Sequence, residues 1–483
     1  MGAQPKNYIL SVLIVVFLVV LILTGLKYTE DATGNTNLKP VNIISQVERE
    51  TPTENNNLIA KSQDALNISL VQEEEKLPPP RAHAPQNAEE QPVTISSDSL
   101  IYNNELGIVR FCDYSANKNG LHSFFSNLQK VNTLNRPVRI AFFGDSFIEG
   151  DILSGDLRRL FQENFGGKGV GMMPITSIVS GFRRTVIHQF SAWNTCSFNN
   201  SNKSKLGING CVYTPNNNAW VYYQGVNKNL LNTFQKVSVF YSLPDNDTRI
   251  FYKKDKGTSV YAKLPKNKNI GRVDIHGSCN NIQISFPPVN NLCVYGVSLE
   301  DTTGVMVDNY SIRGFSGTGL QYLPQERLSQ FCDLLQYDLI ILGYGLNVTE
   351  AKRTNYQGYE NEMIKMVNHL KSSFPNTSVL LVGVPDRSQK INGSYETMPG
   401  ILAMVEHQKN ICQKTGIVFW NLFEAMGGKN SMPLFVNSKP PKANKDYTHL
   451  TFAGGEYLGN LFYETFMYEK AIYERQFLQA MLK

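Results

Sequence analysis

Four short apolar runs constrain the fold of this 483-residue chain most strongly, because each has the length of a buried strand. Uniformly apolar strands that alternate with helices are typical of a parallel sheet covered by helices on both faces. We therefore predict a three-layer α/β fold with a mostly parallel sheet. The runs are Val138 to Phe143, Asp338 to Leu342, Val379 to Val384 and Ile417 to Trp420, and the helical stretches are Ile152 to Phe165, Asn361 to Phe374 and Ile401 to Gln413.

The first run ends abruptly in Gly144-Asp145-Ser146, so a serine hydroxyl follows a buried strand. Open α/β sheets bind their ligands at the carboxyl ends of their strands. Near the other end of the chain, Asp446-Tyr-Thr-His449 precedes a predicted helix, Leu450 to Tyr463. This segment offers a base for the serine and a carboxylate to orient that base. Together the two segments predict acyl transfer, with Ser146, Asp446 and His449 as the catalytic residues.

Two further sets of polar residues each allow two interpretations. Asn347 follows the second strand in a Gly-rich turn, where its amide would donate to a developing oxyanion. An asparagine that serves only the turn is the alternative, because asparagine tolerates positive φ. Glu149 and Asp151 resemble a carboxylate pair for glycoside chemistry. Their neighbours favour a solvated turn instead.

These motifs resemble those of the SGNH (GDSL-like) hydrolases. Gly144-Asp-Ser146, Gly345-Leu-Asn347 and Asp446-Tyr-Thr-His449 match the first, third and last sequence blocks of that superfamily, in the required order. Gly314 resembles the second-block glycine, whose backbone N–H joins the oxyanion hole. The resemblance covers about residues 135–195 and 295–468. It implies a flavodoxin-like parallel sheet, a serine hydrolase, and an oxyanion hole formed by Ser146, Gly314 and Asn347.

Other segments are similar to those of bacterial envelope peptidoglycan O-acetylesterases, among them Gly150-Asp-Ile-Leu153, Met398-Pro-Gly-Ile401 and Ala425-Met-Gly-Gly428. The resemblance implies a serine esterase that removes O-acetyl groups from an envelope glycan such as peptidoglycan. Two alternatives stay open: an O-acetyltransferase, in which a sugar hydroxyl captures the acyl group, and a noncatalytic wall-binding module. Neither a metal nor an organic cofactor is needed for the esterase cycle.

A β-rich stretch interrupts the α/β pattern. Between about residues 195 and 300, short β-rich runs alternate with Asn, Asp, Gly and Lys turns, which is typical of a small sandwich. We predict an inserted β-sandwich-like module over 199–294 between two parts of the hydrolase domain, 98–198 and 295–483. We expect the module to hold a glycan polymer at a distance from the reacting ester.

The amino-terminal region predicts a membrane anchor. Residues 8–26 are apolar and uncharged, and about 20 such residues span a bilayer. A cleavable signal peptide is the alternative, but the run is long for one and no Ala-x-Ala-like site follows. We predict a cytoplasmic tail over 1–7, a transmembrane helix over 8–26, a disordered tether over 27–97, and a catalytic body outside the cytoplasm, in the periplasm or at the cell surface.

Charge and cysteine content narrow the functional classes further. The formal net charge is +5 and the basic residues do not cluster, so the sequence makes no case for binding nucleic acid. Seven cysteines include no zinc-type spacing, so a structural metal is not expected. The pairs Cys196/Cys211 and Cys279/Cys293 would close short loops as disulfides, and buried free thiols are the equal alternative.

Overall fold

The computed structural model describes residues 102–103, 107–198, 203–226 and 231–481, which belong to one compact unit. The predicted cytoplasmic tail, membrane anchor (8–26) and tether (27–97) lie outside the described residues. Within the described ranges, no helix has both the length and the apolar character needed to cross a membrane.

A six-stranded sheet forms the centre of the hydrolase body. Its order is β14-β4-β15-β16-β19-β3, and all pairs are parallel except the edge pair β19/β3. Every residue of β4 is buried, as expected of a central parallel strand that is apolar except for Arg139. The predicted parallel sheet is thus confirmed. The strands are β3 (Cys112–Asp113), β4 (Val138–Gly144), β14 (Val305–Ser311), β15 (Tyr337–Gly343), β16 (Ser378–Val382) and β19 (Val418–Trp420).

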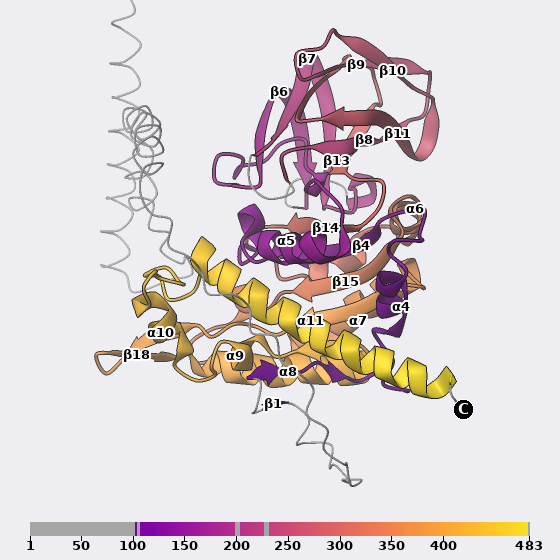
Figure 1. Cartoon of the computed structure of the whole chain (residues 1–483). Helices are drawn as coiled ribbons and strands as arrows, with labels where there is room; N and C mark the ends of the chain where they lie inside the picture. Colours follow the sequence, from indigo (N-terminus) through magenta and orange to yellow (C-terminus); the bar gives the residue numbers. More distant parts are fainter. Residues whose placement is uncertain (1–101, 104–106, 199–202, 227–230, 482–483) are drawn as a thin grey trace, which may run out of the picture. The chain divides into compact units, whose positions relative to one another are not determined.

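Helices cover both faces of this sheet. The chain crosses from β4 to β14 in one direction and from β14 through β15, β16 and β19 in the other, so right-handed crossovers put their helices on opposite faces. Contacts among the rings of Phe124, Phe161 and Phe466 join α4, α5 and α11. Figure 1 shows where these three helices lie in the body. The helices are α4 (His122–Gln129), α5 (Ser154–Phe165), α6 (Gln325–Leu335), α7 (Gln357–Ser373), α8 (Pro399–Thr415), α9 (Leu422–Ala425), α10 (Ser431–Asn437) and α11 (Phe452–Met481).

Helix α11 is much longer than the predicted helix from Leu450 to Tyr463. Phe466 and Tyr473 continue its buried face past the predicted end. Phe466 packs edge-on against Phe111, near the amino-terminal end of the body. The buried face of the helix therefore continues past Tyr463. The charged residues that follow Tyr463 lie between its buried residues and hide this continuation in the sequence.

The β-rich stretch folds into a nine-stranded sheet with its own hydrophobic core. The order is β10-β9-β12-β7-β13-β8-β11, with β6 beside β7 and β5 beside β13. Strands β7 and β13 share the single pair Tyr213/Val294, so the sheet divides into two halves as a sandwich does. The strands are β5 (Gly171–Met173), β6 (Val186–Ser197), β7 (Cys211–Gly225), β8 (Phe234–Leu243), β9 (Thr248–Lys254), β10 (Val260–Leu264), β11 (Asn267–Cys279), β12 (Asn281–Phe286) and β13 (Cys293–Glu300).

The strands of this module extend beyond the predicted bounds of 199–294. Strand β5 pairs with β13 through Met172/Ser298, and β6 pairs along most of β7. The module therefore includes strands from Gly171 to Glu300, on both sides of the predicted segment. Two short antiparallel strand pairs complete the described fold: β1 (Tyr102–Asn103) with β2 (Ile108–Val109), and β17 (Ser388–Ile391) with β18 (Ser394–Thr397).

A buried ionic network connects the module to the hydrolase body. Arg139 of β4 pairs with Asp308 of β14, at 2.9 Å, and with Glu300 of β13. Glu300 also accepts from Lys236 of β8, at 2.8 Å. Buried charges are tolerated when each has a partner, and removing one partner is strongly destabilising. The two parts are therefore coupled through β13 and β14.

All seven cysteines are free thiols, so neither Cys196/Cys211 nor Cys279/Cys293 forms a disulfide in this structure. Burial raises the pKa of the Cys211 and Cys293 thiols above their ordinary values. A raised pKa keeps a thiol protonated and weakly nucleophilic at neutral pH.

Candidate active site

Three adjacent strands deliver the predicted site residues to one edge of the sheet. Strand β4 lies between β14 and β15, and Ser311, Gly144 and Gly343 are in register across the three. The segments that follow these three strands therefore leave the sheet at the same edge, beside one another. Ser146 follows the central strand, Gly314 follows the strand on one side, and Asn347 follows the strand on the other.

The turn after β4 leaves no room for a side chain at Gly144. A Cβ atom there would lie 2.8 Å from the Ile148 side chain and 3.2 Å from the Gly343 carbonyl oxygen. The Gly144 carbonyl also accepts from the Ile312 N–H at 2.9 Å, which holds the chain after β14 against the turn. The sequence Gly-Asp-Ser thus folds into a tight turn that fixes where Ser146 begins.

Ser146, His449 and Asp446 form one hydrogen-bonded chain. Ser146 Oγ lies 3.0 Å from His449 Nε2, and His449 Nδ1 lies 2.8 Å from Asp446 Oδ2. When Nδ1–H donates to the Asp446 carboxylate, Nε2 is the atom that accepts the serine proton. The side chains of His449 and Asp446 are 40% and 49% exposed, so this chain of groups opens to solvent.

The loop between α10 and α11 holds Asp446 in its ionised form. Burial alone would raise the pKa of Asp446, but hydrogen bonds from the His449 side chain and from the backbone N–H groups of His449 and Thr448 lower it to about 2. The carboxylate therefore remains charged at all pH values where the protein would work, and it orients the imidazole throughout that range.

Asp145 is a buried carboxylate beside the serine, and its role was not anticipated from the sequence. It is 1% exposed, and its oxygens accept from the Phe147 N–H at 2.9 Å and from Asn347 Nδ2 at 2.7 Å. Burial raises its pKa to about 6, although these hydrogen bonds and the nearby His449 oppose the rise. The adjacent motif residues, Asp145 and Ser146, thus have very different environments.

Asn347 is placed beside the serine turn, but both of its amide hydrogens already have acceptors. Nδ2 donates to Asp145 Oδ2 at 2.7 Å and, more weakly, to the Phe315 carbonyl at 3.2 Å. The amide would reach an oxyanion by exchanging the longer of these bonds. Asp145 therefore orients the amide whether Asn347 acts as an oxyanion donor or only stabilises the turn.

The backbone N–H groups of Ser146 and Gly314 donate to no other described residue. Gly314 has a φ of 72°, and a Cβ atom there would meet nothing within 4 Å, so its backbone is open to solvent. Free amides at the ends of adjacent strands are suitable donors for a developing oxyanion.

Glu149 and Asp151 do not form a solvated turn, so that interpretation is wrong. Asp151 is 3% exposed and accepts from Arg158 at 3.0 Å and from Arg183 at 2.6 Å. Burial raises the pKa of Asp151, but these two guanidinium groups outweigh burial and hold that pKa well below its usual range. Glu149 accepts from Arg313, the residue before Gly314, at 2.6 Å. Both carboxylates therefore anchor arginine side chains beside the serine turn, and neither is free to act in glycoside chemistry.

A cleft lies beside the serine turn, between the hydrolase body and the β module. Its volume is about 630 Å³, and it is lined by Glu149 and Arg313 on the body side and by Phe190 and Trp193 of β6 on the module side. The segment from β5 to β6 also lines it. In that segment the Phe182 ring packs at a tilt against Phe452, with centroids 5.1 Å apart, and Phe452 follows His449 closely in sequence.

Within the described parts of the chain, no group of three or more His, Cys, Asp or Glu side chains is arranged to bind a metal ion. The residues brought together are those of serine-dependent acyl transfer: a hydroxyl, an imidazole, a carboxylate and free backbone amides.

Among solved structures, a peptidoglycan O-acetylesterase superimposes on this chain with a TM-score of 0.62 at 19% identity, covering 75% of this chain and 99% of that one. An acetyl xylan esterase and a GDSL-like lipase from Parabacteroides merdae ATCC 43184 match more partially, each with a TM-score of 0.26 at 17% identity. They cover 33% of this chain and 80% and 72% of their own.

No protein-family model matches the sequence, and no curated protein sequence matches it either. The similarity to the peptidoglycan O-acetylesterase extends over almost the whole of that protein, and at 19% identity it concerns the fold. The order of the strands, the position of the serine turn and this similarity agree with the three-layer α/β fold that the sequence predicts: the chain shares its fold with that peptidoglycan O-acetylesterase.

Proposed function

We propose that the protein is a serine esterase that removes O-acetyl or other short acyl groups from a cell-envelope glycan such as peptidoglycan. The observation that carries the proposal is the Ser146–His449–Asp446 chain, with distances of 3.0 and 2.8 Å, at the edge of the sheet where such folds bind ligands.

The reaction has two halves in this proposal. His449 Nε2 takes the Ser146 proton as Oγ bonds to the ester carbonyl carbon, and the same proton then passes to the departing sugar oxygen. The acyl group is left on Ser146. Water attacks that ester with His449 again as base, and release of the carboxylic acid restores the Ser146 hydroxyl. Asp446 stabilises the imidazolium in both halves, because its low pKa keeps it charged.

Negative charge on the carbonyl oxygen needs donors near Ser146. The N–H groups of Ser146 and Gly314 have no acceptor among the described residues and fit this role, and Asn347 Nδ2 is the third donor in the proposal. Each such donor contributes about 3 kcal/mol to the transition state. Asp145 beside Asn347 fixes the direction of the amide, because its carboxylate accepts from Nδ2 at 2.7 Å.

The substrate class is proposed on two grounds. A solved structure with the same fold is a peptidoglycan O-acetylesterase. The cleft of about 630 Å³, which Glu149 and Gly150 line just after the serine turn, has aromatic and charged walls that suit a sugar ring. The exposed His449 is consistent with a reacting group at the end of a large polymer chain, where a closed pocket would exclude the substrate.

We also propose the location that the sequence predicts: a single anchor over residues 8–26 with the catalytic body outside the cytoplasm. The support is the uncharged apolar run itself. In cells opened only at their outer face, added protease should then digest the catalytic body. A catalytic body that stays protected would contradict the proposal.

The mechanism can be tested with an organophosphonate that reacts only with activated serines. We expect one equivalent to attach to the peptide that contains Ser146, and we expect the His449→Ala variant to react far more slowly, because the serine loses its base. Labelling at another serine would contradict the proposal. Turnover of an acetylated glycan with a second glycan added separates hydrolysis, which releases acetate, from transfer, which acetylates the added chain.

A further inference from the structure

One face of the β module carries aromatic and polar side chains toward solvent. In strands β7, β12 and β9, alternate residues such as Val221, Ile284 and Ile250 are buried in the core of the module. The residues between them point to the other face. A solvent-facing sheet surface is usually polar, yet Phe251 and Tyr261 on this face are 49% and 54% exposed.

The register of the strands arranges this face into two neighbouring rows. One row crosses five strands through the pairs Ser191/Trp220, Trp220/Ser285, Ser285/Phe251 and Phe251/Tyr261. The other crosses four strands through the pairs Gln189/Tyr222, Tyr222/Gln283 and Gln283/Lys253. Side chains opposite each other on adjacent strands lie about 5 Å apart, so each row is a nearly continuous band.

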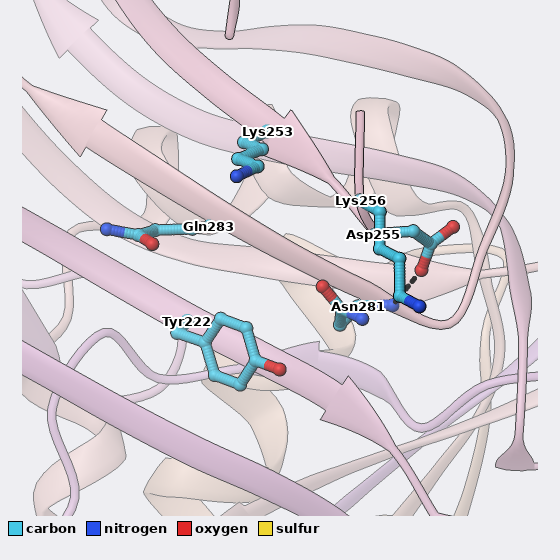
Figure 2. Close-up of a pocket in the computed structure, with 6 residues that line it drawn as sticks. All are labelled: Tyr222, Lys253, Asp255, Lys256, Asn281 and Gln283. Atoms are coloured by element: carbon cyan, nitrogen blue, oxygen red, sulfur yellow. Dashed lines mark hydrogen bonds between the residues drawn. The ribbon is translucent and has the colours of Figure 1, made fainter. Parts of the chain in front are cut away.

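A groove of about 660 Å³ lies at the end of the polar row, lined by Tyr222, Lys253, Asp255, Lys256, Asn281 and Gln283. Figure 2 shows Tyr222, Gln283 and Lys253 one after another across three strands. Asp255 accepts from the backbone N–H groups of Asn280 and Asn281, both at 3.0 Å, so one of its oxygens is hydrogen-bonded to the turn. Within the described chain, Lys253 and Lys256 have no carboxylate partner.

The groove has two lysines and one aspartate, so its net charge is positive, and its other groups are amides and an aromatic ring. Amides pair with hydroxyl and acetamido groups, the flat face of Tyr222 packs on a sugar ring, and ammonium groups attract carboxylates. Trp220, Phe251 and Tyr261 extend the aromatic surface beside the groove. An extended, open site of this composition suits a chain polymer that carries negative charge.

We infer that this face of the β module binds a glycan strand bearing carboxylate groups, with Lys253 and Lys256 pairing with the carboxylates and Tyr222 packing on a ring. The inference rests on the proposed function, because the polymer would be the one whose esters the Ser146 site cleaves. It adds a second contact to that polymer, on the module and separate from the serine cleft.

The test measures binding of the full chain carrying Ser146→Ala, so that the polymer is not consumed. The probes are purified peptidoglycan and the same peptidoglycan with its carboxylates converted to amides. In this background, Lys253→Glu with Lys256→Glu should weaken binding to native peptidoglycan about tenfold, because two attractions become repulsions. The matched control Lys268→Glu, an exposed lysine on β11, should change binding less than twofold.

The remaining arms test the chemistry. The protein with an unaltered groove should bind the amidated polymer as weakly as the double variant binds the native polymer. Added salt should weaken binding of the unaltered groove to the native polymer. Tyr222→Ala should weaken binding to both polymers, because stacking does not depend on charge. Native-like binding by the double variant, equal binding of the two polymers, or no effect of Tyr222→Ala would overturn the inference.

Two further measurements keep the result interpretable. Circular dichroism and the unfolding midpoint check that each exposed substitution leaves the fold intact. Sedimentation of the protein alone detects a second copy on this face: a dimer that the double variant dissociates would overturn the inference in favour of self-association. Failure of the proposed function shows elsewhere, as absent turnover of a small aryl acetate by the wild-type protein.

Discussion

Asp145 links the serine turn to Asn347, and its environment predicts a pH-dependent stability. Its pKa in the folded protein is about 6, above the ordinary value of 3.8, so the folded state holds this proton more tightly than the unfolded state does. The resulting stabilisation is fully present below about pH 4 and is lost as the pH rises through about 6. Two units of pKa correspond to about 3 kcal/mol.

Asp145→Asn removes this titration. The free energy of unfolding of the variant relative to wild type should therefore rise by about 3 kcal/mol between pH 4 and pH 7.5, as measured by chemical denaturation. Asp333→Asn on α6 replaces an exposed carboxylate and should show no such change. A difference between Asp145→Asn and wild type that does not depend on pH would show that Asp145 is not the titrating group.

Asn347 should contribute to turnover rather than to substrate affinity. Asn347→Ala should lower kcat on a small aryl acetate by about 10² to 10³, the effect of losing one oxyanion donor. Asn347→Asp keeps the shape of the side chain but has no N–H to donate, so we expect a similar or larger loss. If only KM changed, Asn347 would be a substrate-binding residue instead.

At the scale of elements, the segment between β5 and β6 is tied to the serine side of the body through Asp151. This carboxylate accepts from Arg158 of α5, from Arg183 of the segment and from Thr185. It has a φ of 68° and follows Gly150, which Phe182 of the same segment covers. One buried residue thus holds the module against the turn that carries Ser146.

Asp151→Asn leaves two buried guanidinium groups without a charged partner. The free energy of unfolding should fall by about 3 kcal/mol, as expected for one broken partner in a buried ionic cluster. Arg159→Gln, also on α5, removes a partly exposed ion pair with Glu163 and should lower the free energy of unfolding by less than about 1 kcal/mol. Equal effects of the two substitutions would mean that the Asp151 cluster does not secure the segment.

At the scale of the whole molecule, the hydrolase body and the β module behave as one folding unit in this account. Arg139, Glu300 and Lys236 form a buried chain of ion pairs between them, and Phe240 of β8 lies in the core of the body with Phe331 of α6. Removing residues 199–288 would expose β13 and leave this network incomplete. The body is therefore not expected to fold without the module.

The three tryptophans allow a direct test, because Trp193 and Trp220 lie in the module and Trp420 lies in the body. A Trp420→Phe variant reports on the module alone, and a Trp193→Phe/Trp220→Phe variant reports on the body alone. In each variant, the denaturation midpoint from fluorescence should equal that from circular dichroism, as in a two-state transition. Separate midpoints would show that the two parts unfold independently.

The central parallel sheet and the positions of the site residues could be predicted because they depend on local pattern. The apolar run in β4 and the Gly-Asp-Ser turn after it are adjacent in the sequence, as are Asp446 and His449. The bond between Asp145 and Asn347 joins residues 202 positions apart, and the Asp151–Arg183 pair joins the body to the module. Such contacts depend on the tertiary fold, which the local sequence does not specify.

The central claim is that Ser146 removes acyl groups from a glycan, and acetate release tests it most directly. O-Acetylated peptidoglycan is incubated with the wild-type protein and with Ser146→Ala, and the released acetate is measured over time. We predict steady release by the wild type and a rate at least about 10³-fold lower for a Ser146→Ala variant whose circular dichroism matches wild type. Release at similar rates by both proteins, or no release by either, would contradict the account.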